Sequence, residues 1–221
     1  MKQTFRQPNN GNVIVMDRFR TDTQATPIRQ VEAYWTALRD GAAVPRRSQI
    51  DPRGIENVLE YAFILERIAP GLARFRIAGS HLTALAGMEV RGMPITSMFT
   101  AGARAEISAA LEHCLDTPAV VEMHLSAEIG MGKPALEGQM ILLPLKSDQD
   151  EISRVFGAMV TRGTPGRTPR RFDLSHIDLR NVTGATPMVT TPERAPVAGF
   201  AEPKATFETN VPHLRLVRSD D

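Results

Sequence analysis

Apolar residues recur at helical spacing near the start of the chain. A helix is predicted to begin at Pro27, which suits a first helical turn, and to stop at Gly41. Its apolar positions lie three or four residues apart and are Ile28, Val31, Trp35 and Leu38. This spacing places them on one face of the helix.

The pattern that follows is typical of a β-hairpin. Residues 61–68 form a short, almost wholly apolar run, as in a buried strand, and residues 72–78 alternate bulky and charged side chains, as in a half-buried one. Pro70 and Gly71 between them signal a turn. Glycines at 87 and 92 then allow only short helices over 81–99, and residues 101–115 predict a longer helix.

Three further strands are indicated by alternation in the second half of the apolar region. They are predicted at residues 119–128, 136–145 and 152–161, with a hairpin loop at 129–134 and a polar turn at 146–151. Runs of antiparallel strands split by a helical insert indicate an α+β domain. We expect a five-stranded antiparallel sheet with short helices on one face and an N-terminal helix.

Composition divides the chain into three parts. Residues 1–25 are polar and are predicted to be a flexible segment, whereas residues 26–162 hold most of the apolar periodicity and are predicted to be the domain. Seven of the sixteen prolines lie after residue 162, among many threonines, so residues 163–221 are predicted to be a largely disordered tail. Two apolar islands in this tail, 170–179 and 211–217, resemble short docking segments.

Charge and cysteine content narrow the class of protein. The chain has 26 basic and 25 acidic residues and a net charge of +1, which argues against a general nucleic-acid or membrane-surface binder. One cysteine, Cys114, rules out an intramolecular disulfide and fits a reducing compartment. The N-terminal apolar run, 13–16, is too short for a signal peptide or a membrane span. A cytoplasmic protein without a membrane partner is therefore expected.

Residues with catalytic chemistry form no recognised pattern. The stretch 130–134 (GMGKP) looks like part of a phosphate loop, but Ala127 and Pro134 stand where that motif needs glycine and a hydroxyl residue. A hairpin turn is the better interpretation. No histidines share a helical metal-ligand spacing, and no hydrolase or metalloprotease motif is present. We expect no catalytic residues and no metal, and hence a protein that is not an enzyme.

Two arginines are candidates for holding an anion or an acidic side chain. Arg76 alternates with Phe75 and Ile77, so it is expected on the opposite face of its strand with an acidic partner or a bound anion. Arg47, in an extended piece beside Arg46, is expected to clamp an anion or to form a structural ion pair.

Several motifs between residues 26 and 173 are shared with a known family. They are Tyr34, Trp35 and Leu38, and the segments 44–68, 73–82, 87–94, 142–145 and 169–173. With the order of elements, they resemble the PAS domain, a small sensory fold, and in particular the single-PAS proteins of alphaproteobacteria (the PAS_5 family). The LRLV stretch at 214–217 is also similar.

The resemblance implies a sheet whose hollow face is roofed by the short helices. A small ligand of such a domain would contact apolar side chains on that face. The candidates are Phe63, Phe75, Ile77, Leu82, Leu85, Met93, Phe99, Met123 and Met140. Neither haem nor flavin is expected. Cys114 ends the long helix, away from the position of the flavin photochemical motif, and a lone histidine is more often structural than a haem ligand.

The resemblance also implies a sensory and regulatory role in signal transduction. No kinase, cyclase or helix-turn-helix module follows the expected domain, so it is expected to act by contact with a signalling protein such as a sensor kinase or a regulator. The N-terminal helix, with Tyr34 and Trp35, is a candidate interface for a partner or a homodimer.

Two other classes of function stay open on the sequence. A small-molecule enzyme on an α+β scaffold would need two titratable side chains that meet inside the hollow of the sheet. A nucleic-acid-associated regulator would use Arg46, Arg47, Arg170 and Arg171, and its binding would weaken with salt. The balanced charge argues against the second class, so no nucleic-acid partner is expected.

Overall fold

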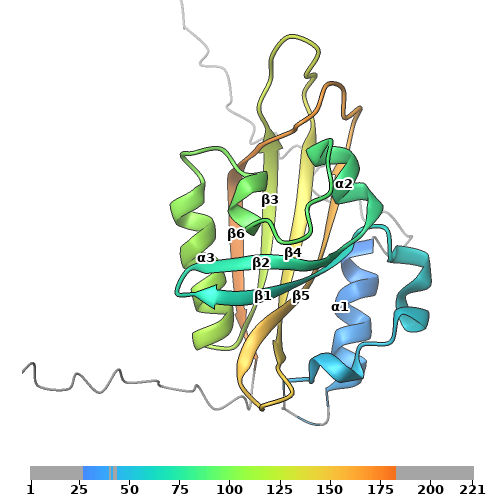
Figure 1. Cartoon of the computed structure of the whole chain (residues 1–221), viewed down its shortest axis with the longest axis vertical. Helices are drawn as coiled ribbons and strands as arrows, with labels where there is room; N and C mark the ends of the chain where they lie inside the picture. The colour runs from blue at the N-terminus through green and yellow to red at the C-terminus, as the bar shows by residue number, and fades with distance from the viewer. Residues whose placement is uncertain (1–26, 40, 42–43, 183–221) are drawn as a thin grey trace, which may run out of the picture. The chain divides into compact units, whose positions relative to one another are not determined.

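An antiparallel sheet of six strands is the centre of the computed structural model, which describes residues 27–39, 41 and 44–182 (Figure 1). Its strand order is β2-β1-β5-β4-β3-β6, and every neighbouring pair is antiparallel. The strands are β1 (Ala62–Ala69), β2 (Leu72–Ala78), β3 (Ala119–Ala127), β4 (Glu137–Lys146), β5 (Ile152–Arg162) and β6 (Phe172–Asn181).

Helices cover both faces of this sheet. We call the face that packs against α2 (Ser80–Ala86), the 3₁₀ helix η4 (Ile95–Met98) and α3 (Arg104–Asp116) the inner face. The outer face packs against α1 (Pro27–Leu38) and the 3₁₀ helix η3 (Pro52–Val58), and a short 3₁₀ turn, η2 (Arg47–Gln49), precedes η3. Two separate apolar cores result, one on each side of the sheet. The predicted α+β fold class is confirmed.

Helix α1 docks on the sheet through the stripe that its sequence predicted. Ile28, Val31 and Trp35 are buried, and the indole Nε1 of Trp35 donates a hydrogen bond to the carbonyl oxygen of Pro144 at 2.9 Å. The indole thus satisfies a backbone acceptor on β4 while its ring fills the outer core.

The helical insert between β2 and β3 begins with a close approach of two backbones. The amide of Gly79 donates to the carbonyl of Ala62 at 2.8 Å, and a Cβ at this position would collide with the carbonyl of Glu60. Helix α2 then ends at Gly87, whose φ of 72° is left-handed. Short helices are therefore held over the inner face, as predicted for this region.

Strand β6 corrects two predictions, the five-stranded sheet and the end of the domain at residue 162. Residues 172–181 lie in the predicted tail but pair with β3 along its whole length. The apolar island there was visible in the sequence, but Ser175 is an extra residue in the β3–β6 register, so the apolar positions fall at Phe172, Leu174 and Ile177. This β-bulge breaks the strict alternation that identifies a strand.

The rest of the predicted tail, 183–221, and the N-terminal segment, 1–25, lie outside the described residues, as does the island at 211–217.

Candidate functional site

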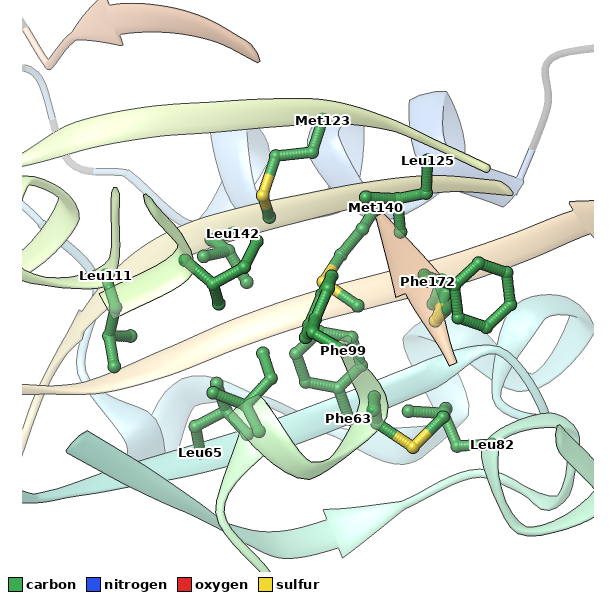
Figure 2. Packing of buried hydrophobic residues seen from close by; sticks show 14 of the residues in the cluster. Phe63, Leu65, Leu82, Phe99, Leu111, Met123, Leu125, Met140, Leu142 and Phe172 are labelled. Carbon is green, nitrogen blue, oxygen red and sulfur yellow. The ribbon is translucent and has the colours of Figure 1, made fainter. Parts of the chain in front are cut away.

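The inner face is where a PAS-type ligand site was expected, and it holds one continuous apolar cluster. Figure 2 shows side chains from α2, α3 and the strands of the sheet pointing toward one another, among them Leu82, Leu111 and Met123. The rings of Phe63 and Phe75 meet edge to face, with centroids 5.7 Å apart and an interplanar angle of 81°. Phe172 from β6 closes the cluster at one end.

Most of the side chains predicted to contact a ligand meet in this cluster. Those with no more than 1% of their surface exposed are Phe63, Phe75, Leu82, Leu85, Phe99, Met123 and Met140. Met93 is half-buried at the margin, where its backbone carbonyl accepts a hydrogen bond from the amide of Phe75 at 2.9 Å. The alternation pattern therefore identified residues that share the inner face of the sheet. Whether they bind a ligand stays a prediction.

Ile77 does not join the cluster, and its prediction as a ligand contact is corrected. Its side chain is 47% exposed, and it pairs with Ile64, whose side chain belongs to the outer core. The register runs from Ile64–Ile77 directly to Leu65–Phe75, so Arg76 is the extra residue of a β-bulge. The bulge shifts the alternation by one residue and turns Ile77 to the face opposite to that of Phe75.

The cluster contains few side chains that could take part in a reaction. Cys114 is its one titratable member among the described residues, and burial raises the pKa of its thiol, so the thiol stays protonated and unreactive. The described residues also contain no group of three or more potential metal ligands. His81 lies outside the cluster, where its Nε2 is 3.1 Å from the hydroxyl oxygen of Thr161, and burial lowers its pKa.

A haem or a flavin does not fit the inner face as it is packed. The ring of Phe63 lies over Gly157, and a Cβ built on that glycine would be 2.5 Å from the ring. Phe63 and Phe99 occupy the middle of the face with their own rings (Figure 2). A planar cofactor would have to expel such side chains, each of which is costly to expose.

An open groove of about 510 Å³ lies beside the N-terminal end of α1 and was not predicted. It is lined mainly by polar residues of β3, β4, β5 and β6, including His124, Ser126, Gln139 and Ser175. The rings of His124 and His176 are 6.0 Å apart on adjacent strands. No sequence signal indicated this groove.

Arginines gather around one carboxylate on the outer side of the β1–β2 hairpin. Glu66 accepts hydrogen bonds from Arg74 at 2.8 and 3.0 Å, and it pairs with Arg154 at 2.8 Å and with Arg76 at 3.3 Å. The hydrogen bond from Arg74 holds the pKa of Glu66 below its usual value, and the charges of the other two arginines act in the same direction. The acidic partner predicted for Arg76 is confirmed.

Among the described residues, the structural ion pair expected for Arg47 is not formed, and its binding of an anion stays a prediction. Within the described residues it has no acidic partner, whereas its neighbour Arg46 pairs with Asp150 at 2.6 Å. Arg46 precedes η2 in extended backbone and reaches Asp150 in the β4–β5 turn, whereas Arg47 is the first residue of η2.

The predicted interface residues are engaged within the chain. Trp35 is 1% exposed beneath α1, so a docked helix cannot offer it to a second chain. The hydroxyl of Tyr34 accepts a hydrogen bond from the amide of Asp51 at 2.8 Å and fixes the start of η3. Its ring lies against Gly54, where a side chain would collide with it. Both residues therefore hold the outer layer together, which corrects the prediction of Trp35 as an interface residue, while an interface role of the half-buried Tyr34 stays a prediction.

An antiparallel sheet with a short-helix insert over one face defines the PAS class of α+β fold. The profile of the PAS_5 family, a PAS domain, matches residues 23–160. The chain belongs to this family, and PAS domains are sensory and regulatory modules.

Among solved structures, the chain is similar to an RNA-binding light-oxygen-voltage receptor. The identity is 15% and the TM-score 0.37, and the match covers 52% of this chain and 35% of that one. The chain thus spans about a third of the length of that structure. No curated protein matches the chain. Within the part of the chain that the structure describes, no helix is both long and apolar enough to cross a membrane.

Proposed function

We propose that this chain is a cytoplasmic PAS regulatory module that acts by contact with a signalling protein, such as a sensor kinase or a regulator. The observation that carries the proposal is the closed inner face. Because the PAS ligand site is filled by the domain's own side chains, the outer surface and the loops are where a partner would read its state.

The proposal includes neither catalysis nor a large cofactor. An enzyme would need converging acid, base or nucleophilic groups, and the inner cluster contributes one thiol whose pKa is raised by burial. The aromatic packing around Phe63 argues against haem and flavin for the reason given above.

A small apolar ligand is the second candidate. The segment from Gly92 to Met98 closes the inner face beside β2, and the half-buried Met93 lies at its margin. Methionine side chains are flexible and fill irregular space, so Met93, Met123 and Met140 could rearrange around a small molecule. Such a ligand would regulate the domain only by binding its two arrangements unequally.

A nucleic-acid role receives less support. Arg170, one of the arginines it would use, is 1% exposed and bonds to backbone carbonyls, and Arg46 pairs with Asp150. The guanidinium of Arg170 is therefore inaccessible to a phosphate, and that of Arg46 has an acidic partner on the surface.

The proposal is tested by affinity purification of the tagged full-length chain from cells that express it naturally, followed by reconstitution with the purified partner. We expect a signalling protein that binds directly and whose activity changes on binding. Recovery of no such protein, or direct binding with no change in partner activity, would contradict the proposal.

A further inference from the structure

The loop between β3 and β4 presents two apolar side chains to solvent. Ile129 is 75% exposed and Met131 is 92% exposed, and the loop projects from the end of the sheet (Figure 1). Single exposed apolar residues are common on protein surfaces, but two such residues at the end of one projecting hairpin form a distinct feature. We call residues 128–134 the hairpin tip.

The hairpin tip has a defined turn. Gly130 and Lys133 exchange backbone hydrogen bonds of 3.1 and 2.9 Å, so Met131 and Gly132 form a two-residue connection. Gly132, the second central residue of the turn, has a φ of 72°, a left-handed value that favours glycine there, as in a type II turn. The ammonium of Lys133 pairs with the carboxylate of Glu128 across the turn. The exposed side chains therefore stand on an ordered backbone.

A buried arginine, Arg170, holds the two sides of the hairpin tip by hydrogen bonds. The guanidinium of Arg170 donates to the carbonyl of Glu128 at 3.0 Å and to that of Pro134 at 2.8 Å, which are the two sides of the hairpin. It also donates to the carbonyl of Pro165 at 2.6 Å, in the chain that returns to β6. Burying a guanidinium is costly, and here Nη1 and Nη2 find these carbonyls while Nε is buried without a hydrogen-bond partner, so a costly group is committed to fixing the loop.

The returning chain adds a second contact and a positive charge. The amide of Arg167 donates to the carbonyl of Gly132 at 2.7 Å, and Gly166 lies so close that a Cβ on it would be 2.5 Å from the same oxygen. The side chain of Arg167 is exposed and, within the described residues, has no acidic partner. Lys133 pairs with Glu128, which also lies near Arg170 and Arg171, so Arg167 is an exposed cation beside the tip that this carboxylate does not pair with.

We infer that the hairpin tip is a preformed docking site for a partner protein with an apolar cleft that carries a carboxylate at its rim. Ile129 and Met131 enter the cleft, and Arg167 pairs with the carboxylate. A braced loop loses little conformational freedom on binding, which is the advantage of building it rigidly. Two apolar side chains fit a cleft of defined shape better than they anchor a chain on a lipid surface, which needs more apolar area or a second signal. This inference rests on the proposed function and names the surface that carries it out.

The test first identifies the contact in cells. A photo-crosslinking amino acid replaces Met131 in the full-length chain, and mass spectrometry locates the crosslinked peptide on the partner. The purified partner is then titrated with the wild-type chain, with Ile129→Ser/Met131→Ser, and with a matched control, Ile68→Ser/Ile77→Ser. The control removes exposed apolar side chains, 50% and 47% exposed, from β1 and β2. All three chains are compared by circular dichroism.

We expect the crosslink to map to an apolar cleft and the tip variant to bind at least roughly 30-fold more weakly, with the control unchanged. Arg167→Glu should also weaken binding, and the loss of affinity should be larger at low salt than at high salt. Equal affinity of the tip variant and the wild type would overturn the inference and leave the proposed function standing, whereas absence of any partner would overturn both. The chain is also sedimented with phosphatidylglycerol–phosphatidylethanolamine vesicles. Sedimentation that depends on the tip, without a protein crosslink, would point to a lipid surface and overturn the inference of a protein partner.

Discussion

Truncation of Trp35 tests whether α1 is an integral layer of the domain. The side chain is 1% exposed and its indole donates to the Pro144 carbonyl at 2.9 Å. Replacing a buried aromatic side chain by alanine costs about 3–5 kcal/mol, which includes the cavity that remains. About 1–2 kcal/mol of this belongs to the lost hydrogen bond and the carbonyl left without its donor. Trp35→Ala should therefore lower the free energy of unfolding by about 4 kcal/mol.

A second variant separates packing from hydrogen bonding. Trp35→Phe keeps an aromatic ring but loses the donor, so it should cost about 2 kcal/mol, with the remainder of the alanine effect due to packing. Ala37→Ser, at an exposed position of the same helix, is the control and should change stability by no more than about 0.5 kcal/mol.

Urea unfolding followed by far-ultraviolet circular dichroism is the suitable assay, because Trp35 is the one tryptophan of the chain and fluorescence is lost in the variants. A loss below about 1 kcal/mol in Trp35→Ala would refute the docking of this helix on the sheet.

Three further variants test other parts of the account. The pKa of Glu66 is lowered in the folded state, so the stability that its carboxylate contributes is lost as the pH falls through that lowered value. Glu66→Gln should lower the free energy of unfolding by about 1 kcal/mol at neutral pH and flatten the acid side of a stability–pH curve. Gly157→Ala should lower stability in a thermal melt by roughly 3 kcal/mol or more, because its Cβ would be 2.5 Å from the ring of Phe63 and from the carbonyl of Ile141. The control Gly138→Ala, whose nearest contact would be 3.3 Å away, should lower stability much less. Arg170→Met should leave carbonyls unsatisfied and cost about 3 kcal/mol, with faster amide hydrogen exchange across residues 128–134. Unchanged acid sensitivity, unchanged melting or unchanged exchange would contradict the respective prediction.

Hydrophobic periodicity predicted the hairpin, the helices and the three-stranded meander because those elements obey simple periods. It failed where a bulge inserts one residue. The extra residue Arg76 turned Ile77 outward, and the extra residue Ser175 hid β6 inside a proline-rich region. A bulge depends on pairing with a distant strand, so the local pattern of one strand does not reveal it.

Buried polar contacts were the second feature that could not be predicted from the sequence. Arg170 was a candidate for contacting a nucleic acid and Trp35 a candidate interface residue, yet both are used inside the domain. Their acceptors are backbone carbonyls far along the chain, and a carbonyl carries no sequence signature. The residues of the inner face were predictable, by contrast, because their assignment depends on alternation alone, apart from the bulge at Arg76.

The central claim is that the inner face is closed by the protein's own side chains. Native mass spectrometry of the purified full-length chain, with its visible absorption spectrum, tests this most directly. We predict the mass of the polypeptide, 24.3 kDa or a whole multiple of it, and no visible absorption band. A bound group the size of haem or flavin, seen as added mass with a visible band, would contradict the claim.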